Sequence, residues 1–582
     1  MVAASATATP PVPAGGMPGA NAARAEMTRG NHPAALQLAC AAIQRDPQCH
    51  DAYVVLGELA LAKPQGESVA ENLFRQALAL RPNDANVQRL LATALVPQGK
   101  VDEAVALAAR ALQAQPRDPA TLLLAARIQL ASNRLVEAEK ILRAAVHFHP
   151  AWREANGLLG DLLKRRGDVS GALIRHRRAA GSNEMTLPPV GRPRRAILLV
   201  QLGAAWASLA SLHRALANDP EWNVTVVGLP FLHSHYSDDS ERHAVFGFLT
   251  EAGIPFVRWE DFRLEPGCAD VAFLHLPYDE TLPRGWHHDD LFRAVPRLVY
   301  IPYALVVVGG TENTAYQFNL PLQQRAWMVV AHSPRNRAMF TRHCTTGDAH
   351  VAITGHPKLD VLQNLDTAPG EALRREAAGR KVVCWNPHFD VRPDGSRFGS
   401  GCSTFLGWQS FLLDEIARRP DLFLLIRPHP LFFSTLAKKN LWSPAEAEEF
   451  QRRIAALPNV RLDSNAEYLP AFSASAAMIS DASSLILEFA ATGRPLLYLR
   501  NPHGPGLNDH GDLVRDHLYT AENESEIRTF LDQIATGSDP RREGRLAALS
   551  EYLVQPEGGA GVAIVRAIDE RLAAEVSPVP VS

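Results

Sequence analysis

The chain has 582 residues, a formal net charge of −3 and 46% hydrophobic residues. At about 150 residues per domain, this length predicts several packed domains. The balanced charge argues against a protein that coats nucleic acid, because phosphate neutralisation needs an excess of Lys and Arg. The six cysteines form no C-x-x-C pair, and no stretch reaches the roughly 20 apolar residues of a membrane span. We therefore expect a cytoplasmic protein, with peripheral membrane contact through a basic patch at 192–195 left open.

The N-terminal third repeats with the period of one helical hairpin. Residues 1–15 read as a disordered tail, and after them prolines recur at intervals of 35, 34 and 34 residues, each with an alanine five residues before it. These prolines are Pro47, Pro82, Pro116 and Pro150, and the alanines are Ala42, Ala77, Ala111 and Ala145. The pattern resembles the tetratricopeptide repeat, and about five copies fit between residues 16 and 181. The resemblance implies a surface for a protein partner, while capping or dimerising the domain behind it is the alternative.

A linker is predicted at 182–195, where prolines occur without apolar periodicity. Behind it, strand and helix patterns alternate and predict two Rossmann-like halves, at 196–365 and 366–575, the second with a closing helix, followed by a tail at 576–582. The expected strands are 196–202, 224–229, 271–274, 298–301, 328–331 and 351–354, then 382–385, 422–426, 460–462, 477–479 and 496–499. The predicted fold is an α-solenoid followed by an α/β GT-B fold, in which ligands bind beyond the carboxyl ends of the strands.

A first candidate site follows the strand 422–426, where Arg427 and His429 are separated by a proline. Two residues apart on an extended chain, their side chains can project to the same side and meet an anionic leaving group. A histidine there can bind phosphate or move a proton, because its ordinary pKa lies near neutrality. The structural alternative is a loop histidine that binds backbone carbonyls.

A second candidate site lies where the strand 477–479 gives way to a helix. Ser480 or Asp481 is expected to cap that helix, and Ser483 and Ser484 place hydroxyls beside its free N–H groups, which favour a diphosphate. Glu488, one turn later, is expected to accept hydrogen bonds from ribose hydroxyls. An ordinary capped helix with a solvated glutamate is the alternative.

In this order, the motifs resemble the family of CDP-glycerol glycerophosphotransferases that prime or polymerise teichoic acids, over roughly residues 195–560. The pieces that carry the resemblance are Thr354 to Asp360, Arg427 to Pro430, and Ser480 to Ser484 through Gly493 to Pro495. The histidine-proline and serine-serine pair is also similar to the cytidine-nucleotide site of bacterial sialyltransferases and polysialyltransferases. The resemblance implies a cytidine-activated donor, with His429 at its phosphate, Arg427 as a neutralising charge, and Asp481, Ser483 and Ser484 lining the nucleotide diphosphate site.

The sequence departs from the family on the acceptor side. Teichoic acid polymerases carry a Trp-His-Gly-Thr segment whose histidine is proposed as the acceptor base, and here Tyr300 to Tyr303 offers no such histidine. His388 is the preferred substitute, with His275 and Asp279 as alternatives, although each also fits a structural loop. His356 is expected to pack or hydrogen-bond between the halves, with a phosphate contact left open.

The sequence thus predicts a transferase that moves glycerol phosphate or a sugar from a cytidine-activated donor to an acceptor hydroxyl in the synthesis of a teichoic acid-like or capsule-like polymer. No metal or cofactor is expected, since the adjacent residues His287 to Asp290 cannot surround one ion. The repeats would bind a glycan acceptor, a protein acceptor or a protein partner. One alternative is a repeat-guided protein glycosyltransferase, an arrangement that is similar to that of O-linked N-acetylglucosamine transferases. The other is a scaffold that binds nucleotide without turnover.

Overall fold

The computed structural model describes residues 16–191, 193–232, 242–363, 365, 368–465 and 467–576. The predicted tail 1–15, residues 577–582 of the second predicted tail, and Arg192 of the basic patch lie outside the described residues. The chain divides into two compact units, residues 1–162 and 163–582, each of which is described by itself.

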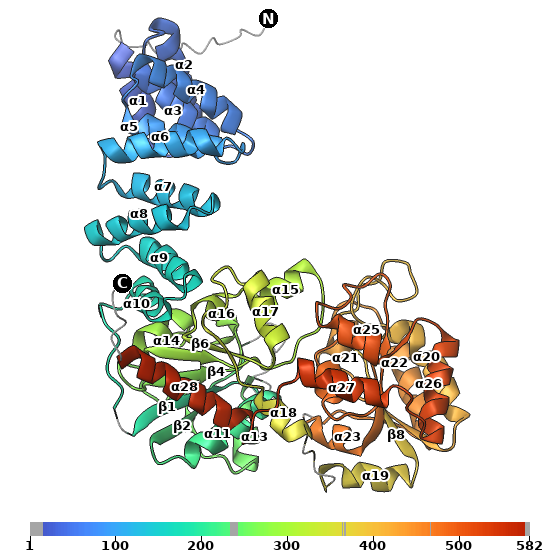
Figure 1. Ribbon diagram of the computed structural model, residues 1–582. Helices are drawn as coiled ribbons and strands as arrows, with labels where there is room; N and C mark the ends of the chain where they lie inside the picture. The colour runs from blue at the N-terminus through green and yellow to red at the C-terminus, as the bar shows by residue number, and fades with distance from the viewer. Residues whose placement is uncertain are drawn as a thin grey trace, which may run out of the picture. The chain divides into compact units, whose positions relative to one another are not determined.

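The first unit is a series of helical hairpins (blue in Figure 1). Each second helix ends two residues before a repeat proline, because the residue preceding proline is disfavoured in the helical conformation. The repeat alanines Ala42, Ala77, Ala111 and Ala145 are at most 1% exposed, which confirms that small residues let the helices approach. The helices are α1 (Gly16–Thr28), α2 (His32–Arg45), α3 (His50–Leu61), α4 (Glu67–Leu80), α5 (Ala85–Leu95), α6 (Val101–Ala114), α7 (Pro119–Ala131), α8 (Leu135–Phe148) and the start of α9 (Arg153–Arg165).

The end of α9 and the helix α10 (Val169–Ala180) belong to the second unit, where they contact helices of its first α/β half. The fully buried Lys164 donates from Nζ to the carbonyl oxygens of Gln324 and Ala326, at 2.7 and 2.8 Å. The buried Arg177 donates from Nε to the carbonyl oxygen of Phe292 at 3.0 Å. Cations thus bind carbonyls at the C-terminal ends of two helices, where the backbone is short of donors. The boundary between the two compact units accordingly follows residue 162 in the chain, N-terminal to the linker expected at 182–195.

Replacing Lys164 with methionine should destabilise the second unit by about 2 kcal/mol, because two buried carbonyls lose a charged donor while the side-chain length is kept. Urea unfolding followed by tryptophan fluorescence measures the effect, since all but one of the nine tryptophans, Trp152, follow residue 163. The exposed neighbour Arg165, changed to methionine, is the matched control. Equal midpoints for both variants would show that the Lys164 contacts add no stability.

The second unit contains two parallel sheets, which confirms the predicted fold class. The first has the order β3-β2-β1-β4-β5-β6-β7, and its central strands are aliphatic and buried on both faces because helices cover a parallel sheet. Its strands are β1 (Arg194–Val200), β2 (Trp222–Gly228), β3 (Val257–Arg258), β4 (Val271–Leu274), β5 (Arg297–Tyr300), β6 (Met328–Ala331) and β7 (Val351–Ile353). The associated helices are η1 (Gly203–Ser208), α11 (Ala210–Ala217), α13 (Ala244–Glu251), η2 (Asp279–Thr281), α14 (His288–Ala294), α15 (Thr311–Phe318), α16 (Pro321–Arg325), α17 (Pro334–His343) and α18 (Pro357–Gln363).

The second sheet has the order β10-β9-β8-β11-β12-β13. All the predicted strands of both halves are confirmed, and only the short edge strands β3 and β13 were not expected. The strands are β8 (Lys381–Asn386), β9 (Leu422–Ile426), β10 (Val460–Leu462), β11 (Ser475–Ser480), β12 (Leu496–Leu499) and β13 (Tyr519–Ala521). The helices are η3 (Ala368–Gly370), α19 (Glu371–Ala377), α20 (Phe405–Ala417), α21 (Phe432–Lys438), α22 (Pro444–Ala455), α23 (Leu469–Ala474), α24 (Leu485–Ala490), α25 (Gly511–His517), α26 (Glu524–Thr536), α27 (Arg542–Tyr552) and α28 (Ala560–Val576).

The last helix, α28, returns to the first sheet and packs on α11 (dark red in Figure 1). Gly561 allows this contact, because a Cβ there would lie 2.3 Å from the carbonyl oxygen of Ser211. Arg297 and Glu575 form a buried ion pair at 2.5 Å that joins β5 to the end of this helix. Among the described residues, no helix is both long and apolar enough to cross a bilayer.

Candidate functional site

The strand order of each sheet reverses at one point, and such points open a crevice at the carboxyl ends of the strands. In the second sheet the reversal lies between β8 and β11. His388 follows β8, and Ser480 to Ser484 end β11 and continue beyond it. His429 follows β9, the other neighbour of β8. The fold therefore brings together the two histidines and the serine segment that the sequence predicted for the donor side.

Asn386, which sequence reasoning did not select, connects these three segments. Its Nδ2 donates to the carbonyl oxygen of Arg427 at 2.8 Å, and its Oδ1 accepts from the hydroxyl of Ser483 at 3.2 Å. The Ser480 hydroxyl lies 3.4 Å from the same Oδ1 and 3.1 Å from the Ser483 hydroxyl. The only available signal in the sequence was its place directly after a buried strand. Asn386 sets the spacing of the loops that carry His388 and His429.

His388 and His429 share one local geometry. In each, Nδ1 accepts the backbone N–H two residues later, from Asp390 and from Leu431, both at 3.1 Å. A nitrogen that accepts a hydrogen bond carries no proton, so the neutral ring has its proton on Nε2. Burial lowers the pKa of His388 to about 4 and that of His429 to about 3, so both rings are neutral near pH 7. The rings lie 5.8 Å apart, and Phe389 packs against both.

This geometry changes the role expected for His388. A general base must offer a free lone pair, but Nδ1 is occupied by the Asp390 N–H and Nε2 carries the proton. Both half-buried histidines are therefore suited to donate hydrogen bonds to an anion without changing charge. The prediction that His388 acts as the acceptor base receives no support from the arrangement of its ring.

Asp481 is fully buried and holds the loop that carries His388. One carboxylate oxygen accepts the backbone N–H of His388 at 2.9 Å, and the other accepts the hydroxyl of Thr404. Burial raises the pKa of Asp481 to about 6. Both carboxylate oxygens consequently accept hydrogen bonds from the protein and position His388, and this arrangement gives no support to the expectation that Asp481 lines the nucleotide diphosphate site.

Arg427 and Glu488 are also engaged within the protein. Arg427 is buried, pairs with Asp463 at 2.6 Å and donates to the carbonyl oxygen of Asn465 at 2.8 Å. Glu488 is fully buried and pairs with Lys358 at 2.8 Å. Each charge is thus neutralised by its partner. The ion pairs give no support to the expectation that Arg427 neutralises a phosphate or to the expectation that Glu488 accepts hydrogen bonds from ribose hydroxyls, and the burial of Glu488 excludes the alternative of a solvated glutamate.

The two serines after β11 differ in their surroundings. Ser483 is buried and its hydroxyl is bound to Asn386, whereas Ser484 is half-buried and its side chain makes no capping hydrogen bond. Ser484, and neither Ser480 nor Asp481, is the N-cap of α24. Because α24 has six residues, its dipole adds little to anion binding. Ser484 is the donor-side serine that is best placed to meet a ligand.

The acceptor-side candidates follow the first sheet, whose order reverses between β1 and β4. His275 follows β4, is 1% exposed, and accepts the backbone N–H of Gln201 on Nε2 at 3.2 Å. Asp279 is half-buried and accepts the backbone N–H of His288 at 2.6 Å. His356 donates from Nε2 to the carbonyl oxygen of Pro302 at 2.6 Å and accepts the N–H of Lys358 on Nδ1. His356 therefore has no ring nitrogen left for phosphate, and both of these hydrogen bonds lie within the first half, whereas the sequence led us to expect a contact between the two halves.

The segment from Thr354 to Asp360 connects three parts of the second unit. His356 binds the loop after β5, Lys358 pairs with Glu488 of α24, and Asp360 accepts the backbone N–H of Ala560 at 2.9 Å, at the start of α28. Gly355 has a φ of +71°, and a Cβ there would lie 2.8 Å from the carbonyl oxygen of Val554. This motif is therefore structural in the geometry observed.

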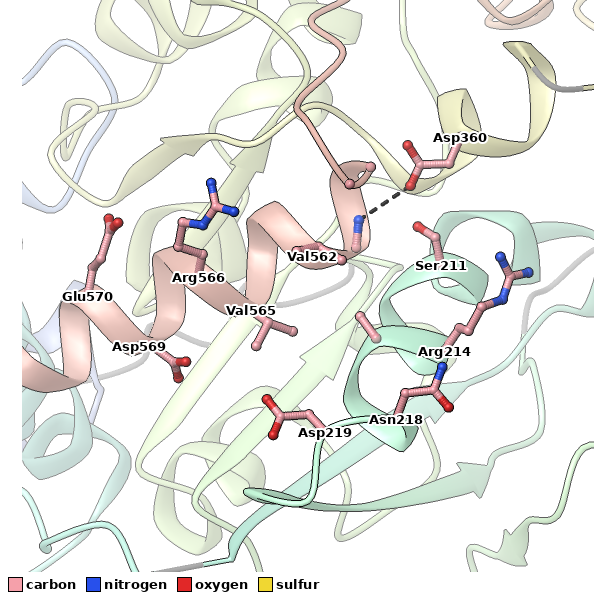
Figure 2. Close-up of a pocket in the computed structure, with 14 residues that line it drawn as sticks. Ser211, Arg214, Asn218, Asp219, Asp360, Val562, Val565, Arg566, Asp569 and Glu570 are labelled. Carbon is pink, nitrogen blue, oxygen red and sulfur yellow. Dashed lines mark hydrogen bonds between the residues drawn. The ribbon is translucent and has the colours of Figure 1, made fainter.

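Two cavities lie away from the histidines. A groove of about 750 Å³ runs between α11 and α28, and Figure 2 shows Arg214 and Asp360 at its right and Asp569 on α28. A smaller cavity of about 90 Å³ is lined by Trp206, Phe248 and Tyr468 among others. None of the side chains predicted to be catalytic lines either cavity.

Buried neutral histidines make the stability of the second unit sensitive to acid. The pKa of His275 and of His356 is lowered to about 3 by burial, so below pH 6.5 the unfolded chain binds protons that the folded chain does not. The contribution of each histidine to the free energy of unfolding is therefore fully present above pH 6.5. It decreases as the pH falls, by about 2 kcal/mol per histidine near pH 5. Asp481 acts in the opposite direction by about 1 kcal/mol, since its raised pKa keeps a proton in the folded state. Urea midpoints near pH 7.5 and pH 5 measure the net loss, and a midpoint that stays constant or rises on acidification contradicts it.

Family models match both the repeat region and the α/β region of the chain. Tetratricopeptide repeat models match residues 21–85, 68–119 and 95–162, and the model of CDP-glycerol:poly(glycerophosphate) glycerophosphotransferase matches residues 306–502. No curated protein matches the chain.

Similar solved structures include an O-GlcNAc transferase of Thermobaculum terrenum, at 15% identity and a TM-score of 0.33, covering 96% of this chain and 98% of that one. MnaA of S. aureus, solved with UDP, is 13% identical with a TM-score of 0.43, and the match covers 65% of this chain and 97% of that one. YrrB, a repeat protein with a peptide-binding site, is 20% identical with a TM-score of 0.26, over 28% of this chain and 84% of that one.

Proposed function

We propose that this chain, which joins tetratricopeptide repeats to a CDP-glycerol glycerophosphotransferase domain, transfers glycerol phosphate or a sugar from a cytidine-activated donor to an acceptor hydroxyl. The observation that carries the proposal is the pair of neutral histidines, His388 and His429, at the strand-order reversal of the second sheet. Both lie within the segment that matches the transferase family.

The chain would act by positioning the donor and stabilising charge. The acceptor oxygen forms a bond to the phosphorus or sugar carbon of the donor, and the bond from that atom to the nucleotide phosphate oxygen breaks. The nucleotide leaves with the electron pair, and the acceptor proton goes to the nucleotide or to solvent. Nε2–H groups of His388 and His429 and the hydroxyl of Ser484 supply hydrogen bonds to the departing phosphate, which is where negative charge develops.

The repeats would bind a partner or an acceptor. Tetratricopeptide arrays bury only the contacts between neighbouring repeats and leave an extended surface for a ligand. We propose that this surface binds a protein or a carrier-linked glycan, and that the reaction takes place in the cytoplasm, as part of cell-surface polymer synthesis.

Nucleotide binding tests the proposal directly. Thermal shift and titration calorimetry with CMP, CDP, UMP, UDP and GDP should show a preference for the cytidine nucleotides. The variant His429→Gln keeps a donor group near the position of Nε2 and should bind CMP more tightly than His429→Ala, by about 1 kcal/mol. The exposed His503, changed to alanine, is the control for effects of histidine removal elsewhere in the same half.

Two outcomes would count against the proposal. Equal stabilisation by all five nucleotides would remove the cytidine assignment. Binding of CDP-glycerol and CMP-sugars with no consumption of the donor, in the presence of any acceptor, would favour the scaffold alternative over a transferase.

A further inference from the structure

The reversal point of the first sheet carries a group of neutral polar side chains. The strand order reverses between the paired strands β1 and β4, and β5 is the next neighbour of β4. His275 and Tyr278 follow β4, and Tyr303 follows β5. A crevice at the carboxyl ends of parallel strands is the usual ligand position in such a sheet. These residues therefore occupy the place where the first half would receive the acceptor.

His275 has a buried donor with no partner. Its Nε2 accepts the N–H of Gln201, so the ring proton is on Nδ1, and Nδ1 is buried without a hydrogen bond among the described residues. Leaving such a donor unpaired costs about 1–3 kcal/mol, so it indicates a site for a ligand acceptor group or water. Burial, together with the charge of Lys358, lowers the pKa of His275 to about 3 and keeps the ring neutral. Because Lys358 is paired with Glu488, this donor offers a hydrogen bond with little net positive charge.

Tyr278 and Tyr303 form a half-buried aromatic pair at the same edge of the sheet, after the neighbouring strands β4 and β5. Their hydroxyl oxygens are 3.2 Å apart, and their rings meet edge to face at 6.2 Å. Burial raises the pKa of both phenols, so they stay protonated and uncharged. Tyrosine combines an apolar ring with a hydrogen-bonding tip. A sugar ring, which has C–H faces and hydroxyl edges, matches that combination.

The charges next to the tyrosines disfavour a polyanion. Asp279 and Glu280 directly follow Tyr278 in the chain. Asp279 is half-buried and Glu280 is exposed. A poly(glycerol phosphate) chain carries one negative charge per unit and would be repelled by these carboxylates. A neutral glycan has no such penalty.

We infer that the acceptor is a hydroxyl of a neutral glycan, bound by His275, Tyr278 and Tyr303, and not the end of a poly(glycerol phosphate) chain. This inference rests on the proposed transferase function and specifies its acceptor. It assigns the two tyrosines to acceptor binding, and it leaves the transferred group open.

Saturation-transfer NMR on the full chain with saturating CMP tests the inference. The probes are three neutral disaccharides, diacetylchitobiose, maltose and lactose, and a tetramer of glycerol phosphate. We expect transfer to at least one disaccharide and none to the tetramer. In the double variant Tyr278→Phe/Tyr303→Phe, which keeps both rings, binding of that disaccharide should weaken about fivefold while CMP binding is unchanged. The exposed Tyr316, changed to phenylalanine, is the control.

Saturation transfer to the tetramer alone, or to none of the four probes, would overturn the inference. Unchanged disaccharide affinity in the double variant would also overturn it, because the phenol hydroxyls would then have no part in binding. These results leave the transferase proposal standing as long as CMP binds. If the wild-type chain shows no preference for cytidine nucleotides, the proposed donor is contradicted, and that result is separate from the test of the acceptor.

Discussion

Replacing His429 with alanine should reduce transfer from the cytidine-activated donor by about 10²–10³-fold, the range seen when one donor to a developing negative charge is removed. The variant His429→Gln should recover at least about tenfold of that loss, because its amide can donate from near the position of Nε2. Since burial lowers the pKa of His429 to about 3, wild-type activity should show no titration of this ring between pH 5.5 and 8. Steady-state rates of the two variants across this pH range measure both effects.

The comparison between glutamine and alanine separates two mechanisms. A glutamine variant as inactive as the alanine variant would show that His429 moves a proton, because an amide cannot do so. That result would contradict the assignment of Nδ1 as an acceptor for the Leu431 N–H. CMP affinity, measured in the same variants, shows whether the loss arises in donor binding or in the chemical step.

Replacing Glu488 with alanine should destabilise the second unit by about 3–5 kcal/mol, the cost of leaving a buried charge unpaired. Lys358 is 4% exposed and Glu488 is fully buried, so neither charge reaches solvent. The Lys358 Nζ also lies 5.4 Å from the ring of Tyr468 at the start of α23. Lys358→Met alone should be as damaging, because it leaves the carboxylate unpaired. The urea midpoint of the second unit, read from tryptophan fluorescence, measures each loss.

The double variant Lys358→Met/Glu488→Leu provides the decisive comparison. Replacing both charges with apolar groups of similar size removes the desolvation cost as well as the attraction, and should recover most of the stability. The exposed pair Arg452 and Glu449 of the second unit is the control, since Glu449→Ala should cost less than about 1 kcal/mol. Additive losses in the double variant would show that Lys358 and Glu488 do not depend on each other.

The sequence was enough to predict which segments of the candidate site follow buried strands. His388, His429 and the serine segment each follow a buried aliphatic run, and parallel strands place their carboxyl ends at one edge of a sheet. The aliphatic runs and the common edge of a parallel sheet were enough to expect that these segments lie close together. Asn386, which connects them, was missed because an asparagine after a strand has no distinctive spacing.

The amino-acid sequence by itself determined the repeat, the two sheets and the segments that meet at the second reversal point, because these depend on local periodicity and on short aliphatic runs. Only the tertiary structure decided which charges remain for a ligand. Arg427 pairs with Asp463, and Glu488 pairs with Lys358, which is 130 residues away in the chain. A buried charge needs an oppositely charged partner that is also buried. Tertiary packing, and not spacing along the sequence, decides which residue that partner is. The same holds for the two histidines, whose backbone hydrogen bonds place the proton on Nε2 and suit both rings to donate hydrogen bonds.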